Sequence, residues 1–439
     1  MFDRLGRFVV RRRKAVVAAT AIFFVAAGVL GGGVAEKLSG GGFEDPNAES
    51  TLAAEVLEKE FGQQSPNLIL LVTAQDGDVD SGQASEFGLA LTNELEQADD
   101  VEQALSYWSS GIPQLKSRDG SQALVFAVIP GDDDHVKEVI EGVSPLFTRD
   151  GETLDVAVTG FAEVFRQMQE TIEADLVRAE SVAIPITLIA LIFVFGSVVA
   201  ASLPLAIGIL SIIGSFLILS VVASLTQVSI FALNLTTALG LGLAIDYSLF
   251  VVSRYREELR KGLDHHAAVE ETVRTASRTV AFSGFTVAVS LAALLVFPVA
   301  FLRSFAYAGV AVVLLAAFAS VTFLPALLAI LGHRVDKFRV FKHKDREVGE
   351  GFWHRVATSV MRRPISIASI VIVFLLLVGS PFFGISWGQA DDRSLPAETS
   401  SRAALDDIRQ NFELNEANAL QVVAVESGDP SGLMEDIDS

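Results

Sequence analysis

An aspartate stands in the middle of a long apolar stretch of this sequence, within GLGLAIDYSLFVVSRYREEL at residues 240–259. Asp246 lies eight residues before Arg254, where a basic run begins. At about 1.5 Å per helical residue, that spacing places the carboxyl roughly 12 Å from the end of the apolar stretch, close to the middle of a hydrocarbon core about 30 Å thick. An ionisable side chain at such a depth is costly and marks a functional site.

Asp246 has no obvious cationic partner, because no Lys or Arg occurs in any of the seven apolar segments described below. A carboxyl isolated from cations in an apolar medium favours its neutral form, so it can take up a proton on one side of a membrane and release it on the other. On a helix Gly242 and Phe250 share its face, and the Tyr247 hydroxyl can share or pass a proton. Ser283, in the fifth segment, is a candidate polar contact. This is the chemistry of a proton relay.

Two other roles for Asp246 stay open. The carboxyl can hydrogen-bond to a neighbouring helix for packing alone. It can also bind sodium, but a sodium site needs several oxygen ligands, and Asn234, Thr236 and Thr237 lie two to three turns away on a straight helix. Proton coupling is therefore the favoured interpretation.

The apolar residues that surround this site fall into separate segments. The chain of 439 residues is 51% hydrophobic and yet carries a net charge of -20, so its apolar and acidic parts must be separate. Segments of about 20 apolar residues have the length of a membrane span. The first resembles a signal peptide but is longer than a usual signal core, which favours an uncleaved span. The seven segments are roughly 15–36, 181–201, 203–224, 228–253, 279–298, 304–331 and 365–386.

Charge assigns a side to each loop. Residues 38–180 contain 29 Asp and Glu against 7 Lys and Arg, whereas DRLGRFVVRRRK, RYREELRKGLDHH and HRVDKFRVFKHKDR are basic. These basic stretches lie on one side if every segment crosses once, and the positive-inside rule makes that side cytoplasmic. We expect a plasma-membrane protein with a cytoplasmic N-terminus and an extracytoplasmic acidic region. Juxtamembrane charge explains the basic runs without a nucleic-acid partner.

The sequence favours neither an enzyme nor a metal site. It contains no cysteine, and no phosphate-binding loop is present. LDHHAAVEE and GDDDH lack the spacing of a metal cage and are interpreted as solvated surface. We expect no catalytic residue and no cofactor.

Residues 38–180 are long enough for a folded domain. SPNLILLVTAQ, QALVFAVIPGDDD and TLDVAVTG read as strands. GQASEFGLALTNELEQA and DHVKEVIEGVSPLF read as helices, and FAEVFRQMQETIEADLVRAES as a helix that continues into the second span. This alternation predicts a small α+β domain of the split-βαβ kind.

The chain also repeats itself. A constant offset of about 351 residues carries Arg4 onto Arg355, Ala53 onto Ala404 and Phe61 onto Phe412, and LILLVTAQ onto ALQVVAVE. Six spans lie in the first copy, so the repeat is parallel, with an axis along the membrane normal. The second copy stops early, which predicts a truncated piece of a longer protein, in which the missing repeat is a partner. A natural half-length protein that pairs with a second chain is the alternative, and homo-oligomerisation is left open.

These patterns divide the chain into six parts. They are 1–37, cytoplasmic N-terminus and first span; 38–180, extracytoplasmic domain; 181–331, spans two to six; 332–363, cytoplasmic basic linker; 364–387, seventh span; and 388–439, the beginning of a second extracytoplasmic domain.

The motif Gly242 to Tyr247 with its continuation DYSLFVVSRYREEL, together with AVEETVRTASRTVAFSG and LPALLAILG, resembles the MMPL (mycobacterial membrane protein large) family of the resistance-nodulation-division superfamily. The resemblance covers the family's first half and the opening of its second. It implies a multi-pass α-helical bundle with a porter-like α+β domain, and proton-driven export of lipids or other hydrophobic compounds to the cell envelope. It implies that Asp246 and Tyr247 are one half of the proton relay, with Phe250 and Ser283 close by in the central channel.

Two alternative functions accompany this expectation. Related accessory factors of protein secretion, the SecDF proteins, share the overall plan and use the proton gradient to pull polypeptide. A sterol-sensing or receptor-like membrane protein would bind a ligand without transport. The DYSLFVVSRYREE continuation argues against the first, and the unpaired carboxyl against the second.

Overall fold

The computed structural model describes residues 1–439 except 62–64, 341–351, 386–387, 389–390 and 414–439. Within that part of the chain seven helices are long and apolar enough to cross a membrane, and each overlaps one predicted segment. They are α2 (Arg13–Gly31), α7 (Phe161–Phe195), α8 (Val198–Ala223), α9 (Phe231–Arg260), α10 (His265–Ala292) with its 3-10 turn Ala293–Val296, α11 (Ala300–Val321) with α12 (Phe323–Leu331), and α14 (Pro364–Gly379). The chain is a multi-pass helical membrane protein, as predicted.

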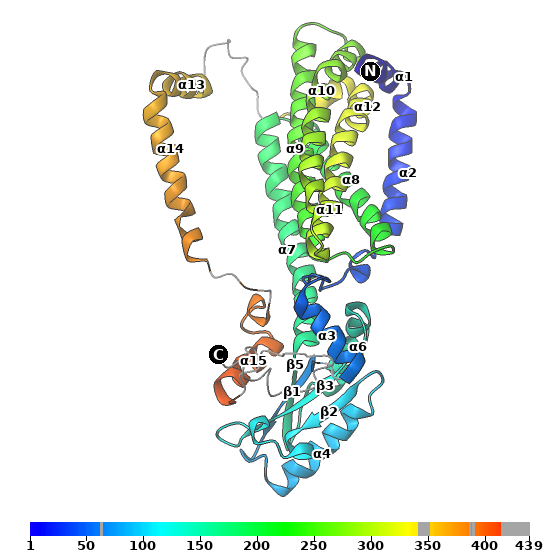
Figure 1. Cartoon of the computed structure of the whole chain (residues 1–439). Coiled ribbons are helices and arrows are strands. Elements are labelled where there is room, and N and C mark those ends of the chain that lie inside the picture. The colour runs from blue at the N-terminus through cyan, green and yellow to red at the C-terminus, as the bar shows by residue number, and fades with distance from the viewer. Residues whose placement is uncertain (62–64, 341–351, 386–387, 389–390, 414–439) are drawn as a thin grey trace.

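The first six spans form one bundle, and the seventh stands apart from it (Figure 1). Half of the apolar window of α8 is buried, whereas none of that of α14 is. The short helices α1 (Phe2–Arg11) and α13 (Phe352–Arg362) precede α2 and α14, so the repeat in the sequence is also a repeat of local structure. α14 therefore begins a second set of spans whose other members are not in this chain.

The second span ends earlier than the sequence suggested. Gly196 has a left-handed backbone (φ 68°) that caps α7, and Ser197 accepts a hydrogen bond from the Ala200 amide as the N-cap of α8. The connection is therefore only two residues long, and residues 198–201 belong to the third span. An apolar run on both sides of the turn hides this break from a hydropathy reading.

The external part contains a five-stranded antiparallel sheet in the order β2-β3-β1-β5-β4. In chain order β1, β2, β3 and β5, with α4 and α6 between them, this is the predicted split-βαβ arrangement. The strands are β1 (Leu68–Ala74), β2 (Glu102–Ser106), β3 (Gln122–Val128), β4 (Arg149–Asp150) and β5 (Leu154–Thr159), and the helices are α4 (Gly82–Glu96), α5 (Tyr107–Ser110) and α6 (Asp133–Phe147). Short 3-10 turns lie at Ala35–Lys37, Pro113–Leu115, Gly332–Asp336, Ser380–Gly384 and Asp392–Ser394.

One face of this sheet is covered by the domain's own helices. Leu91 and Leu95 of α4 and Ile140 of α6 share a core cluster with Leu70 and Val72 of β1. α7 continues from β5 through the single glycine Gly160 and runs 35 residues, about 52 Å, into the membrane bundle (Figure 1). Domain and bundle are therefore joined by one uninterrupted helix.

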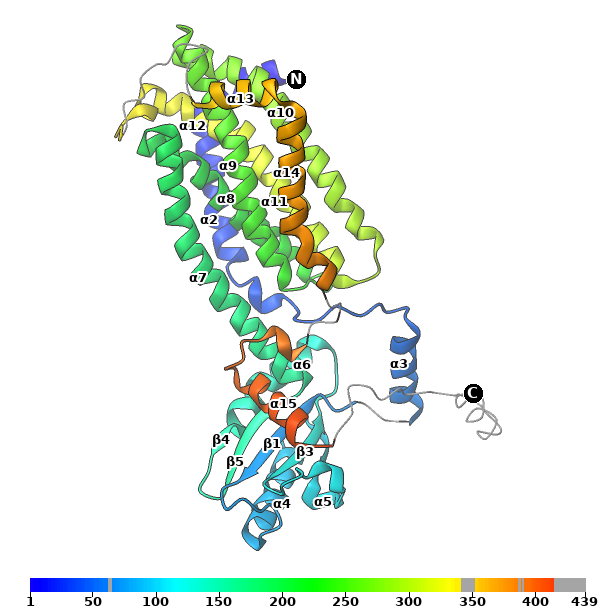
Figure 2. The same cartoon turned by 90° about the vertical axis from the view of Figure 1, so that its left-hand side faces the viewer.

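The other face is covered by α15 (Ser400–Asn411), which follows the seventh span (Figure 2). Phe412 and Ala404 are buried in one cluster with Leu71, Leu124 and Phe126 of the sheet. The Thr159 and Ser401 hydroxyls lie 2.8 Å apart, and the Gln167 amide donates to the Ser400 hydroxyl at 2.8 Å. A segment of the second repeat thus completes the domain of the first.

The repeat-related helix of the first copy, α3 (Glu49–Phe61), does not do the same. It projects away from the sheet in Figure 2, and Leu52 is 49% exposed. The sequence matches Ala53 with Ala404, but only Ala404 is buried.

Candidate functional site

Asp246 lies on α9, at the centre of a stripe that the described residues leave uncovered. Six residues of α9, spaced three or four apart, have exposed side chains: Asn234, Ala238, Gly242, Asp246, Phe250 and Ser253. Residues at this spacing form one face of a helix. The expected Gly242–Asp246–Phe250 face is therefore present, and nothing in the described part of the chain packs on it.

The carboxyl of Asp246 has neither an ion pair nor a hydrogen bond within the described residues. Asn234, Thr236 and Thr237 do not reach it, because the two threonine hydroxyls donate within their own helix, to the carbonyls of Ala232 and Asn234. The arrangement that a sodium ion would need is therefore missing from this face of the bundle. What the carboxyl has is an open apolar surface with a glycine on one side and a phenylalanine ring on the other.

Tyr247 points in another direction from its neighbour. Only 6% of it is exposed, and its hydroxyl has no hydrogen-bond partner among the described residues. A Cβ atom on Gly284 of α10 would lie 3.7 Å from that hydroxyl and 2.9 Å from the Cβ of Ala317 on α11. The absence of a side chain at Gly284 therefore leaves the Tyr247 hydroxyl its place between α10 and α11.

The two glycines near the site have opposite surroundings. A Cβ on Gly240 would lie 2.6 Å from Cγ1 of Ile212 and 2.9 Å from Cγ2 of Val312, so this glycine lets α8 and α11 approach α9. A Cβ on Gly242 would meet nothing within 4 Å. Gly240 serves packing inside the bundle, whereas the space beside Gly242 is open.

The remaining predicted neighbours lie close along the helices. Phe250, 44% exposed, is one turn from Asp246 on the same stripe. Ser283 is half-buried on α10, directly before Gly284, which faces the Tyr247 ring. The structure thus brings Ser283 near Tyr247, while Gly242 and Phe250 accompany Asp246.

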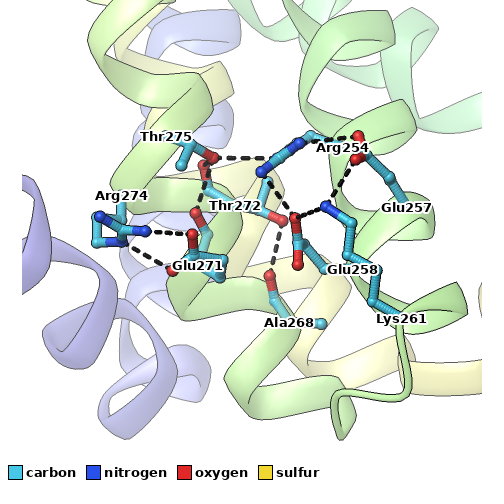
Figure 3. Close-up of polar contacts among 9 residues, drawn as sticks. All are labelled: Arg254, Glu257, Glu258, Lys261, Ala268, Glu271, Thr272, Arg274 and Thr275. Atoms are coloured by element: carbon cyan, nitrogen blue, oxygen red, sulfur yellow. Dashed lines mark hydrogen bonds and ion pairs between the residues drawn. The ribbon is translucent and has the colours of Figure 1, made fainter.

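A charged cluster fixes the end of α9 that the sequence had only identified as basic (Figure 3). Arg254 contacts Glu257 at 2.9 Å and the nearly buried Glu258 at 2.8 Å, and its Nε donates to Thr275 of α10 at 3.3 Å. Lys261 contacts both glutamates, at 2.7 and 3.0 Å, and these contacts raise the pKa of Lys261. This Arg254 cluster ties α9 to α10 about 12 Å from Asp246. The sequence reading missed it because the i, i+3 and i, i+4 spacing does not identify the contact on the next helix.

The paired histidines belong to the same end of the bundle. Asp264 accepts hydrogen bonds from the amides of Ala267 and His266 as the N-cap of α10, and these bonds lower the pKa of Asp264. Among the described residues no three His, Cys, Asp or Glu side chains gather as a metal site would require. LDHHAAVEE therefore starts a helix here.

Comparison with known proteins adds three relatives and a family. The model of the MMPL family matches residues 42–367. The trehalose monomycolate exporter MmpL3 of Mycolicibacterium smegmatis is 33% identical over 91% of this chain and 44% of its own length. The putative membrane protein SCO6666 of Streptomyces coelicolor is 35% identical over 94% of the chain and 58% of its own length. The mycolic acid-containing lipids exporter MmpL11 of Mycolicibacterium smegmatis is 28% identical over 82% and 38%. The chain therefore spans about half the length of the curated relatives it matches.

Proposed function

The chain belongs to the MMPL family, and from that premise we propose that it is part of a proton-driven exporter of lipids or related hydrophobic compounds to the cell envelope. Two relatives are named as exporters of trehalose monomycolate and of mycolic acid-containing lipids. These names support a lipid substrate and a non-enzymatic role. In this proposal Asp246 takes up and releases the coupling proton.

The observation that carries the proposal is the unpaired carboxyl on the open stripe of α9. An aspartate that faces lipid at mid-membrane costs about 2.5 to 3.5 kcal/mol even on insertion scales. A protein cover over Asp246 removes the contact with lipid, and the rest of the protein is the natural source of that cover, because α14 already begins a second set of spans. The site is then buried between two bundles.

Protonation of a carboxyl at such an interface changes which arrangement of the two bundles is stable. The neutral acid tolerates the apolar neighbours Ala238 and Phe250, whereas the carboxylate requires water or a polar partner. Any difference in the position of the covering helices between these two states is driven by the proton. The single helix α7, which joins bundle and external domain, gives that movement a path to the lipid-handling side.

Tyr247 is the second member of the proposed relay. Its buried hydroxyl lacks a partner among the described residues, so a water molecule or a moved side chain is needed to satisfy it. Such a water provides a step for a proton between the open stripe and the interior of the bundle. Gly242, Phe250 and Ser283 then shape the space around the two relay residues.

The proposed orientation follows from charge. α1 and the Arg254 cluster lie at one end of the bundle and the acidic sheet domain at the other (Figure 1). With the positive-inside rule the N-terminus is cytoplasmic and the sheet domain is outside.

The test is transport by the full-length protein, reconstituted in vesicles with an imposed pH gradient and a fluorescent lipid. We expect Asp246→Asn to lower proton-coupled transport by about 100-fold or more, since the neutral amide cannot exchange a proton, while the melting behaviour stays close to wild type. Asp246→Glu should keep part of the activity. The matched control is Ser253→Ala on the same stripe, which keeps the carboxyl. Wild-type transport by Asp246→Asn would rule out the proposed role.

A further inference from the structure

An apolar groove opens on the bundle away from the α9 stripe. It has a volume of about 740 Å³ and lies between α2, α8, α11 and α12, with α1 across one end. No residue of α9 or α10 lines it. The groove is therefore a different surface from the one that carries Asp246.

The groove has the depth of one lipid leaflet. Along α2 its lining runs from Arg12 to Phe23, eleven residues or about 16 Å, and half of a hydrocarbon core is about 15 Å. Ala15 and Ala19 form a smooth wall on the α2 side, and Leu315 and Phe318 form the wall on α11. These dimensions and this lining fit an acyl chain that enters from the membrane.

The only charged residue that lines the groove is a cation. Arg12 stands at the corner between α1 and α2 and has no ion pair with any described residue. Its neighbours Arg11 and Lys14 also have no acidic partner in the described part of the chain, and Asp3 is the single acid of α1. The mouth of the groove is therefore positively charged where a lipid headgroup would lie.

A second groove adjoins the first. Its volume is about 680 Å³, and it shares Leu5, Leu315, Phe318 and Thr322 with the first groove. Leu315, Phe318 and Thr322 are spaced as one face of a helix, so they form a ridge with one groove against each flank. Two apolar channels beside one cationic corner match the two acyl chains of a phospholipid.

We propose that these grooves bind a phospholipid of net negative charge from the leaflet beside Arg12, with one chain in each groove and the headgroup on the Arg12 guanidinium. A guanidinium binds a phosphate through parallel N–H donors, and each juxtamembrane cation adds attraction to anionic lipid. The lipid occupies a fixed place under α1 and does not pass through the Asp246 site. The proposal is independent of transport.

The test uses the full-length protein in nanodiscs that contain equal amounts of phosphatidylglycerol and phosphatidylcholine. After detergent extraction, native mass spectrometry counts the lipids that stay bound. We expect phosphatidylglycerol to be retained in preference, and Arg12→Gln to lower its retention about five-fold, as expected for the loss of one cation near the surface. Arg11→Gln is the matched control, because Arg11 does not line the groove.

A second variant tests the apolar part without changing the charge. Ala19→Trp fills the first groove and should reduce retention of phosphatidylglycerol to the level of Arg12→Gln. Equal retention of both lipids, or equal effects of Arg11→Gln and Arg12→Gln, would overturn the charge-based assignment. If helices of the missing repeat fill the groove, Ala19→Trp will lower the melting temperature and leave the bound lipid unchanged, which also contradicts the proposal.

Discussion

Two surfaces of this protein stand in contrast: the outer face of the external sheet and the stripe on α9. The sheet face is closed by α15, with Phe412 only 2% exposed. The α9 stripe is open, although it carries the one acidic residue deep in an apolar helix. Both are faces of the first repeat that its own elements do not cover.

The contrast shows that the repeats complete each other surface by surface. About 50 residues after the seventh span are enough to close the sheet, because one helix covers it. The bundle needs several spans to cover α9, and α14 alone stands apart from it. An element from the second repeat closes the domain, so we infer that the spans of that repeat close the stripe.

The largest expected effect comes from filling the open side of α9. Gly242→Leu in the full-length protein should lower transport by about 100-fold, because a displacement on the order of 1 Å at a reacting group costs that much. The described bundle has room for the new side chain, so its stability should change little. Vesicle transport and thermal melting of the same preparation measure the two quantities.

Gly240→Leu is the matched variant on the closed side. Its Cβ would lie 2.6 Å from Ile212, so overpacking should cost at least about 1 to 3 kcal/mol of stability. If the two variants lose stability equally, the stripe is not the interface that the comparison requires.

The covered sheet gives the next effect. Phe412→Ala should destabilise the external domain by about 3 to 5 kcal/mol, the usual cost of deleting a buried aromatic ring. Hydrogen exchange in β1 and β3 should then increase. Leu52→Ala on the projecting helix α3 is the control, since a half-exposed leucine should matter much less; equal exchange in both variants would mean that α15 does not stabilise the sheet.

The smallest effect concerns pH and separates the external domain from the bundle. Lys116 and the Tyr107 hydroxyl donate to Asp80 at 2.8 and 2.6 Å, and these bonds lower the pKa of Asp80 below its ordinary value of 3.8. A carboxyl whose pKa is lowered on folding stabilises the fold above that ordinary value, and this contribution disappears as the pH falls through the lowered pKa.

Unfolding of the domain monitored between about pH 6 and pH 2 should therefore show a small acid-dependent loss that Asp80→Asn removes. The effect is small because the Asp80 side chain is half exposed. Asp76→Asn is not a suitable control, since hydrogen bonds also lower the pKa of Asp76. Glu86→Gln, on α4, is an appropriate one. An identical acid loss in Asp80→Asn would remove Asp80 as its source.

Much of the fold follows from the sequence because its signals are local. Apolar runs of span length and the change from alternating to helical periodicity predicted seven spans and the order of β1, α4, β3, α6 and β5. The Asp246 face also followed from helix geometry alone. The family resemblance is likewise confirmed.

Other features depend on contacts that local signals do not contain. β2 was missed because its five residues are mostly exposed and its pairing with β3 shifts register between Glu102 and Leu105. β4 has only two residues. The separation of Tyr247 from the open stripe depends on where α10 and α11 pack. The strand expected in ALQVVAVE lies outside the described residues.

The docking of α15 also sets the order of events during synthesis. Thr159 and Ser401, which meet in the finished domain, are 242 residues apart in the chain. At 5 to 20 residues per second, roughly 10 to 50 s separate the appearance of the sheet from that of its cover. During this interval the uncovered face of the sheet is exposed. Because α15 follows α14 in the chain, insertion of the seventh span sets the moment at which the first external domain completes its folding.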